Sequence, residues 1–250
     1  MTAGLLRSIV TCMYANPRDK QIVASFGQFR QLTSAHLDVM HFHDVTETPK
    51  YRAINRLLER HLIALVPWPG RMRGGVGGGS AYNVYQLGSM GRKLLGRSGR
   101  PMTAVNPHTL GIADAFCEIL EYAHKGRIEI FEYRTEPNSW WDVNGVIVRP
   151  DLDVRYNDVW RREGGHVFIE YDRASEHDRI IRAKLDDYIA AYNSIDGDDE
   201  NVPPFPLVVF VAEDAPRAKE LQKLVDERSE HDRELFLVST VTEFAPLLFS

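Results

Sequence analysis

The chain has 250 residues, of which 44% are hydrophobic, 10% aromatic and 26% charged, the composition of an ordinary globular protein. This composition excludes a mostly disordered chain, a collagen-like fibre and a coiled coil. No segment approaches the roughly 18 apolar residues that a membrane helix needs, so we expect no membrane partner. The short apolar run near the amino terminus is broken by Ser8 and Thr11 and does not predict a signal peptide. Cys12 and Cys117 are far apart in the sequence, which favours a reducing cytoplasm.

The net charge of −5 hides a strong division along the chain. Residues 1–105 hold 14 Lys and Arg against 5 Asp and Glu, whereas residues 106–250 hold 16 against 30. Between Pro49 and Arg100 there are ten basic residues and one acid, Glu59. A solvated surface rarely excludes one sign of charge so completely. The first half is therefore predicted to bind an anionic partner, and we expect that partner to be double-stranded DNA.

Hydrophobic periodicity predicts three helices in the first half. The first covers residues 17–30, and the second covers residues 32–40 with Thr33 as N-cap. The third opens with Thr48 as N-cap and Pro49 at the first helical position. Its core face is predicted to hold Ile54, Leu57 and Leu58, with His61 at the margin, and its opposite face Lys50, Arg52, Asn55, Arg56, Glu59 and Arg60.

A hairpin is predicted after these helices. Residues 62–68 form an apolar run closed by prolines, residues 70–80 a glycine-rich loop, and residues 81–87 an alternating return strand. Three helices and a hairpin predict a winged helix-turn-helix domain over residues 1–95, with the third helix in the major groove and the loop as the wing. A flexible solvent loop remains the alternative for residues 74–79. The candidate DNA-binding residues are Lys50, Arg52, Asn55, Arg56, Arg60, Arg71 and Arg73, with Asn55 and Arg56 as candidates for base edges.

The second half predicts a different architecture. Glycines, Ser98 and Pro101 indicate a linker over residues 96–105. After it, helices and strands predict a mixed α/β sandwich over residues 106–250. Helices are expected near residues 109–124, 176–193 and 216–228, and strands near 127–133, 145–156, 166–172, 207–212 and 235–239. A turn is expected at the end of the chain.

Two of these strands end in carboxylates. Asp151 and Asp153 are two residues apart, as are Glu170 and Asp172, so each pair shares one face of its strand. Adjacent strand ends of this kind can gather oxygen ligands for Mg²⁺ or Mn²⁺. We expect the Asp151 and Glu170 carboxylates to lie about 4–6 Å apart, the reach of a shared cation.

The pattern Pro150-Asp151 followed by Glu170 resembles that of the PD-(D/E)XK nucleases, which share a restriction-endonuclease-like fold. Asp172 stands where those enzymes have a lysine. Two substitutes are available: Arg173, which can stabilise charge but not act as a base, and Lys184 on the next helix. Asp151, Glu170 and Lys184 are thus the candidate catalytic residues, with Asp151 and Glu170 as metal ligands. Structural pairing of Lys184 with a carboxylate is the alternative.

The whole order of motifs resembles the replication-relaxation family of plasmids and other mobile elements, over about residues 17–195. The matching segments in the first half are Leu32-Thr33, Arg56-Leu57-Leu58, Tyr82-Asn83-Val84-Tyr85 and Gly91-Arg92-Lys93-Leu94-Leu95. Those in the second half are His108-Thr109-Leu110, Arg149-Pro150-Asp151, Phe168-Ile169-Glu170-Tyr171-Asp172-Arg173 and Lys184-Leu185.

The resemblance implies DNA binding in the replication, relaxation or transfer of a mobile genetic element, and leaves catalysis open. Two classes of function follow. The first is a non-catalytic DNA-binding protein, as a replication or relaxation factor or a transcriptional regulator, and the missing lysine favours it. The second is a metal-dependent DNA endonuclease or nickase. Candidate partners besides DNA are a second copy of the chain, a relaxase and replication proteins.

Overall fold

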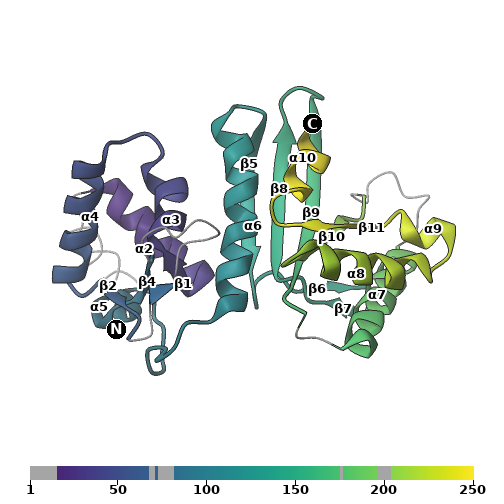
Figure 1. Ribbon diagram of the computed structural model, residues 1–250, viewed down its shortest axis with the longest axis horizontal. Helices are drawn as coiled ribbons and strands as arrows, with labels where there is room; N and C mark the ends of the chain where they lie inside the picture. The colour runs from purple at the N-terminus through teal and green to yellow at the C-terminus, as the bar shows by residue number, and fades with distance from the viewer. Residues whose placement is uncertain (1–15, 68–70, 73–81, 175–176, 196–203) are drawn as a thin grey trace. The chain divides into compact units, whose positions relative to one another are not determined.

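The computed structural model describes residues 16–67, 71–72, 82–174, 177–195 and 204–250 (Figure 1). The chain divides into two compact units, residues 1–113 and 114–250. Each unit combines helices with a β-sheet, so the predicted mixture of α and β structure is confirmed. Helix α6 (Pro107–His124) crosses the boundary between the units.

The first unit begins with helix α2 (Pro17–Phe29), close to the predicted bounds. Asn16 caps it by accepting a hydrogen bond from the Arg18 N–H, and Pro17 occupies the first helical position. The remaining elements of this unit are β1 (Gln31–Thr33), α3 (Ser34–Leu37), the π-helix η1 (Asp38–Phe42), α4 (Glu47–Glu59), β2 (Ile63–Leu65), β3 (Arg71–Met72), β4 (Tyr82–Leu87) and α5 (Ser89–Leu94).

Thr33 is the N-cap of the second helix, as predicted. Its side chain accepts from the His36 N–H, and His36 Nδ1 accepts from the Thr33 N–H, so that each residue caps the other. The predicted start at Leu32 is wrong because residues 31–33 form the short strand β1. Three residues are too few to show a period in the sequence.

The third helix begins two residues earlier than predicted. Its N-cap is Thr46 rather than Thr48, and Pro49 is its third residue. This position suits proline because the first N–H groups of a helix have no intrahelical acceptor. Ile54 and Leu57 are buried as expected, whereas His61 is exposed in the left-handed region with φ 54°.

Strand β4 is the centre of the sheet in the first unit. It pairs antiparallel with β1, β2 and β3, with Tyr85 opposite both Leu32 and Leu65. The predicted return strand is therefore confirmed over residues 82–87. Trp68 and residues 73–81, which include Arg73, lie outside the described residues.

Part of the predicted linker is fixed to the first unit by two buried glutamines. The Gln86 amide donates to Met102 O and accepts from Met102 N, both at 2.8 Å. The Gln31 amide donates to Ala104 O and accepts from Asn106 N, also at 2.8 Å. Each amide therefore bonds residues 102–106 much as a neighbouring strand would.

The second unit is a three-layer structure around a sheet of order β11-β10-β9-β8-β5. Strand β8 is antiparallel to both of its neighbours, and β9, β10 and β11 are parallel to one another. The elements are β5 (Ile128–Thr135), β6 (Trp141–Val143), β7 (Val146–Val148), β8 (Leu152–Asp158), β9 (Glu163–Asp172), α7 (Asp178–Asn193), β10 (Leu207–Ala212), α8 (Ala215–Asp226), α9 (Glu230–Arg233), β11 (Phe236–Thr240) and α10 (Phe244–Phe249).

Helices cover both faces of this sheet (Figure 1). On one face Phe168 and Phe210 pack with Leu185 of α7 and Leu221 of α8. On the other face Tyr156 packs edge-on against Phe249 of α10, where the sequence predicts only a turn. The terminal segment folds as a helix because its apolar residues, including Phe244 and Phe249, are buried against the sheet.

The predicted strand over residues 145–156 is divided in two. β7 pairs with β6 in a separate two-stranded sheet, and β8 begins at Leu152. Pro150 at the break lacks an N–H for a ladder, and its carbonyl accepts from the Ser139 hydroxyl. The break places Asp151 directly before β8.

Candidate functional site

The outward face of α4 is the first candidate surface. Ala53, Ile54 and Leu57 face the core, so Arg52 and Asn55 lie on the opposite side of the helix. Arg52 is exposed and Asn55 half-exposed, and neither forms a hydrogen bond or ion pair within the described part of the chain. Both side chains are therefore available to an external partner.

Lys50 and Arg56 are engaged within the first unit. Lys50 Nζ lies 2.6 Å from Asp38 Oδ2, and the spacing of three and four residues to the buried Ala53 and Ile54 places Lys50 on their side of the helix, not on that of Arg52 as predicted. Arg56 forms two bonds with Asp19, Nε to Oδ2 at 2.8 Å and a terminal nitrogen to Oδ1 at 2.6 Å. Asp19 is only 1% exposed, so this arginine has a structural partner.

Of the three remaining candidate DNA-binding residues, two are among the described residues. Arg60 is exposed at the C-cap of α4. Arg71 belongs to β3, which pairs with β4 through Asn83. Arg73 is outside the described residues.

Asp151 and Glu170 come together in the second unit. Leu152 lies opposite Ile169 in the antiparallel β8–β9 ladder, so the same register brings Asp151 opposite Glu170. Both side chains are buried, at 5% and 2% exposure. The structure therefore brings together the two carboxylates that the sequence singles out.

Glu170 is bound by two side chains of α7. Lys184 Nζ lies 2.9 Å from Oε2, and the Tyr188 hydroxyl donates to Oε1 at 2.6 Å. Asp151 Oδ2 accepts the Tyr171 N–H at 2.8 Å. Of the two substitutes for the missing lysine, Lys184 reaches the pair, whereas Arg173 lies 3.6 Å from Glu213.

The environment of Glu170 raises its pKa to about 7. Burial is the largest cause and the charge of Asp151 the second, while Lys184 and the Tyr188 hydroxyl oppose them. The same burial, together with Glu170, raises the pKa of Tyr188 well above its usual value. Glu170 therefore gains and loses its proton close to neutral pH.

Asp172 does not replace the missing lysine in function. Its two oxygens accept from Arg217 of α8, at 3.0 Å from Nε and 3.1 Å from a terminal nitrogen. Both side chains are almost fully buried, at 3% and 7% exposure. This ion pair fixes α8 to the end of β9. Neither Arg217 nor Tyr188 was predicted, because their partners lie far away in the sequence.

The fourth acid, Asp153, is turned toward aromatic side chains. Its carboxylate accepts from Trp141 Nε1 at 3.1 Å and lies 2.7 Å from His166 Nε2. It is therefore no ligand for an ion held by Asp151 and Glu170.

The residues present do not fit a preformed site for the predicted Mg²⁺ or Mn²⁺. In the described ranges no three His, Cys, Asp or Glu side chains form a group that could hold a metal ion. Both oxygens of Glu170 are engaged by Lys184 and Tyr188, so an ammonium stands where the ion would bind.

Comparison with known proteins identifies the family. A model of the replication-relaxation family matches residues 24–203, which is most of the chain, and the protein belongs to that family. The resemblance found in the sequence is confirmed. No curated protein and no solved structure gives a significant match. Among the described helices, none is long and apolar enough to cross a membrane.

Removal of the Arg56 side chain should destabilise the first unit. Arg56→Ala leaves the buried Asp19 carboxylate without its partner, which we expect to lower the free energy of unfolding by about 1–3 kcal/mol. Arg52→Ala is the matched control, an unpaired arginine on the same helix, and should change it by less than about 0.5 kcal/mol. Urea unfolding followed by circular dichroism measures both. Equal effects of the two variants would contradict a structural role for Arg56.

Glu170 should make the stability of the second unit depend on pH. Glu170→Gln keeps an acceptor for Tyr188 but cannot ionise. In the wild type Glu170 is protonated in both the folded and the unfolded chain below pH about 4.5, and the stability that its raised pKa favours is lost as the pH rises from there through about 7. We therefore expect the melting temperature of the variant, relative to wild type, to increase between pH 5 and pH 8.

The exposed carboxylate variant Glu129→Gln provides the control for this titration. Its melting temperature relative to wild type should stay flat over the same pH range. A Glu170→Gln difference that is constant would show that folding leaves the pKa of Glu170 unchanged, and one that falls with rising pH would show that folding lowers it; either result would contradict this prediction.

Proposed function

We propose that the protein binds double-stranded DNA through a winged helix-turn-helix in its first unit, and acts in the replication or relaxation of a mobile genetic element or in its regulation. The observation that carries this proposal is the order α2–β1–α3–α4–β2–β3–β4, in which β4 pairs with β1, β2 and β3. Three helices followed by strands that return to one small sheet are what this motif requires.

The surface of α4 supports the proposal. Arg52 and Asn55 face outward and have no partner in the described ranges. Arginine binds guanine or phosphate, and asparagine binds adenine, in the major groove. The excess of basic residues in the first half adds affinity for the DNA backbone that does not depend on base sequence. A transcriptional regulator would use the same surface.

The second unit is proposed to be a nuclease-like domain without catalytic activity of its own. The binding of Glu170 by Lys184 and Tyr188, and of Asp172 by Arg217, supports this view. One observation favours the second candidate, a metal-dependent endonuclease or nickase: Asp151, directly before β8, lies close enough to Glu170 of β9 for its charge to raise the pKa of that glutamate. Dimerisation, binding to a relaxase or replication proteins, and a cytoplasmic location also belong to the proposal.

Variants of the outward face should weaken DNA binding. Fluorescence anisotropy with a labelled duplex of mixed sequence, titrated at several salt concentrations, measures affinity and its salt dependence. If Arg52 contacts phosphate, Arg52→Ala should reduce the slope of log affinity against log salt concentration by about 1. If Asn55 contacts a base, Asn55→Ala should reduce the binding free energy by about 1–3 kcal/mol, and only for the duplex sequence that the protein prefers.

The double variant Arg71→Ala and Arg73→Ala should weaken binding to all duplexes and flatten the salt dependence of the affinity. Arg149→Ala, in the second unit, should have no effect. Wild-type affinity in all three test proteins would overturn the docking surface.

The purified protein should not cleave DNA on its own. Supercoiled and linear DNA incubated with Mg²⁺ or Mn²⁺ should remain intact, because Lys184 occupies the cation position on Glu170. Cleavage that requires the metal and is lost in both Asp151→Ala and Glu170→Ala would establish the endonuclease instead. Circular dichroism of the two variants separates loss of activity from loss of folding.

A further inference from the structure

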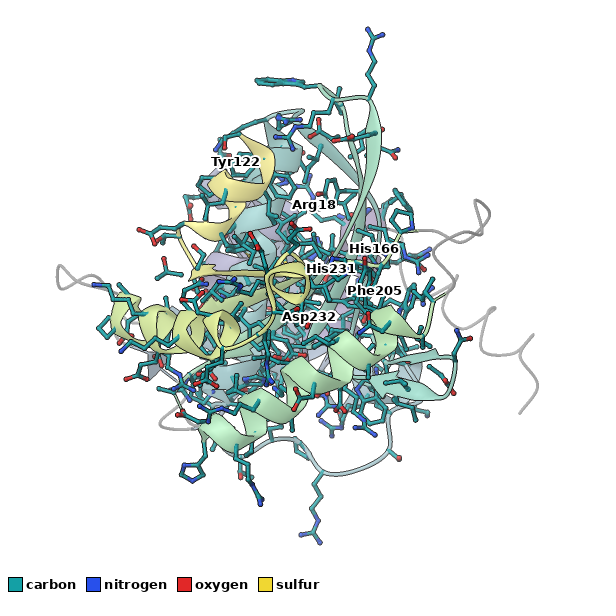
Figure 2. The ribbon with its side chains drawn as sticks, turned by 90° about the vertical axis from the view of Figure 1, so that its right-hand side faces the viewer. Arg18, Tyr122, His166, Phe205, His231 and Asp232 are labelled. Atoms are coloured by element: carbon teal, nitrogen blue, oxygen red, sulfur yellow. The ribbon has the colours of Figure 1, made fainter. Side chains whose placement is uncertain are left out.

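A cavity of about 670 Å³ lies in the second unit, beside strands β8 and β9. Its wall includes His166 and Phe205, both labelled in Figure 2, together with Phe131, Trp141, Arg155 and Gly164. His166 precedes Glu170 by four residues on β9, which is about 13 Å along a strand. The cavity is therefore distinct from the acid pair. Its volume is in the range of pockets that hold small ligands, about 300–1,000 Å³.

Aromatic rings and a guanidinium form the wall of this cavity. The Trp141 and His166 rings have centroids 5.1 Å apart, and the Arg155 guanidinium lies 4.9 Å from the centre of the Trp141 ring. Phe131 is 62% exposed, although it sits on a strand. Flat rings beside a cation bind a planar aromatic group that carries negative charge.

The rings are held in place before any ligand arrives. Asp153 is 2% exposed and bonds both Trp141 Nε1 and His166 Nε2, so one buried carboxylate fixes both rings. A wall that is already ordered loses little entropy on binding. The acid of the cavity wall, Asp142, accepts from the Gly145 N–H at 2.8 Å and belongs to the β6–β7 turn.

Arg155 is not fully satisfied within the chain. Its contact with Glu132 is 3.6 Å long, beyond a hydrogen bond, and its buried Nε has no partner among the described residues. Gly164, on the neighbouring strand β9, also lines the cavity, and a Cβ atom added there would meet no other atom within 4 Å. The cavity thus combines free space with a guanidinium whose ion pair with Glu132 is long, so that a phosphate can compete for it.

We propose that this cavity binds a single nucleotide, with the base stacked on the aromatic wall and the phosphate paired with Arg155. Guanidinium groups pair with phosphate through charge-assisted hydrogen bonds, and base stacking on aromatic side chains tolerates any base. The same chemistry is offered by a free nucleotide and by an unpaired nucleotide of single-stranded DNA. This site does not depend on the duplex-binding surface of the first unit.

Calorimetry with the full chain tests this site, using dTMP, thymidine and an oligothymidylate as probes. We expect saturable binding of dTMP or of the oligonucleotide, and weaker binding of thymidine. Arg155→Gln should weaken binding of the phosphate-bearing probe about tenfold, the loss of one charge-assisted contact, and leave thymidine unchanged. Gly164→Leu should fill the cavity and abolish binding of every probe.

The matched control is Arg149→Gln. Arg149 lies 5.2 Å from the ring centre of Trp140, a second arginine–tryptophan pair that does not line the cavity, and its loss should leave binding unchanged. Binding of dTMP would assign a free nucleotide, and binding of the oligonucleotide alone would assign single-stranded DNA. No saturable binding of either, or equal losses in Arg155→Gln and Arg149→Gln, would overturn the proposal. Circular dichroism confirms that each variant is folded.

Discussion

Four carboxylates on one face of strands β8 and β9 must each be compensated, because a buried carboxylate without a partner is costly. The four are 2–5% exposed, and they are Asp151, Asp153, Glu170 and Asp172. Asp151 accepts from a backbone N–H, and Asp153 bonds an indole and an imidazole. Glu170 bonds an ammonium and a phenol, and Asp172 bonds a guanidinium. The partners come from β6, β9, α7 and α8, so this requirement fixes the positions of the elements that cover the face.

The four acids differ in how completely their charge is balanced. Asp172 accepts two hydrogen bonds from the guanidinium of Arg217, which also donates one to Glu220. Asp151 and Glu170, by contrast, lie together with one ammonium, that of Lys184, so this pair keeps an excess of negative charge. Burial is the main reason that the pKa of Glu170 rises to about 7 although a lysine is bonded to it, and the charge of Asp151 adds to this effect.

Local patterns in the sequence predict the elements well and their partners poorly. The strand over residues 207–212 is confirmed at both ends, because a continuous apolar run between polar and proline-rich segments is buried most easily as an inner strand, here between β9 and β11. Strand alternation likewise predicts that Glu170 and Asp172 share a face. The pairing of Asp172 with Arg217 could not be predicted, because 45 residues separate them and nothing local marks either as buried. For the same reason Arg56 is predicted as a base reader, since its partner Asp19 is 37 residues away.

The aspartate at position 172 has a physical basis in the same charge balance. Arg217 is 7% exposed and reaches the end of β9 from α8, so a lysine at position 172 would bury a second cation beside it and leave Arg217 with the exposed Glu220 in place of a buried anion. An aspartate there neutralises Arg217, and the ammonium next to Glu170 has to come from another element. Helix α7 supplies it, because Lys184 and Tyr188 are four residues apart and lie on the same helix face. Lys184 keeps 29% of its side chain exposed, whereas a lysine on the strand would be enclosed. Supplied from α7, the cation beside Glu170 thus remains partly in contact with solvent, and no lysine has to be buried on the strand.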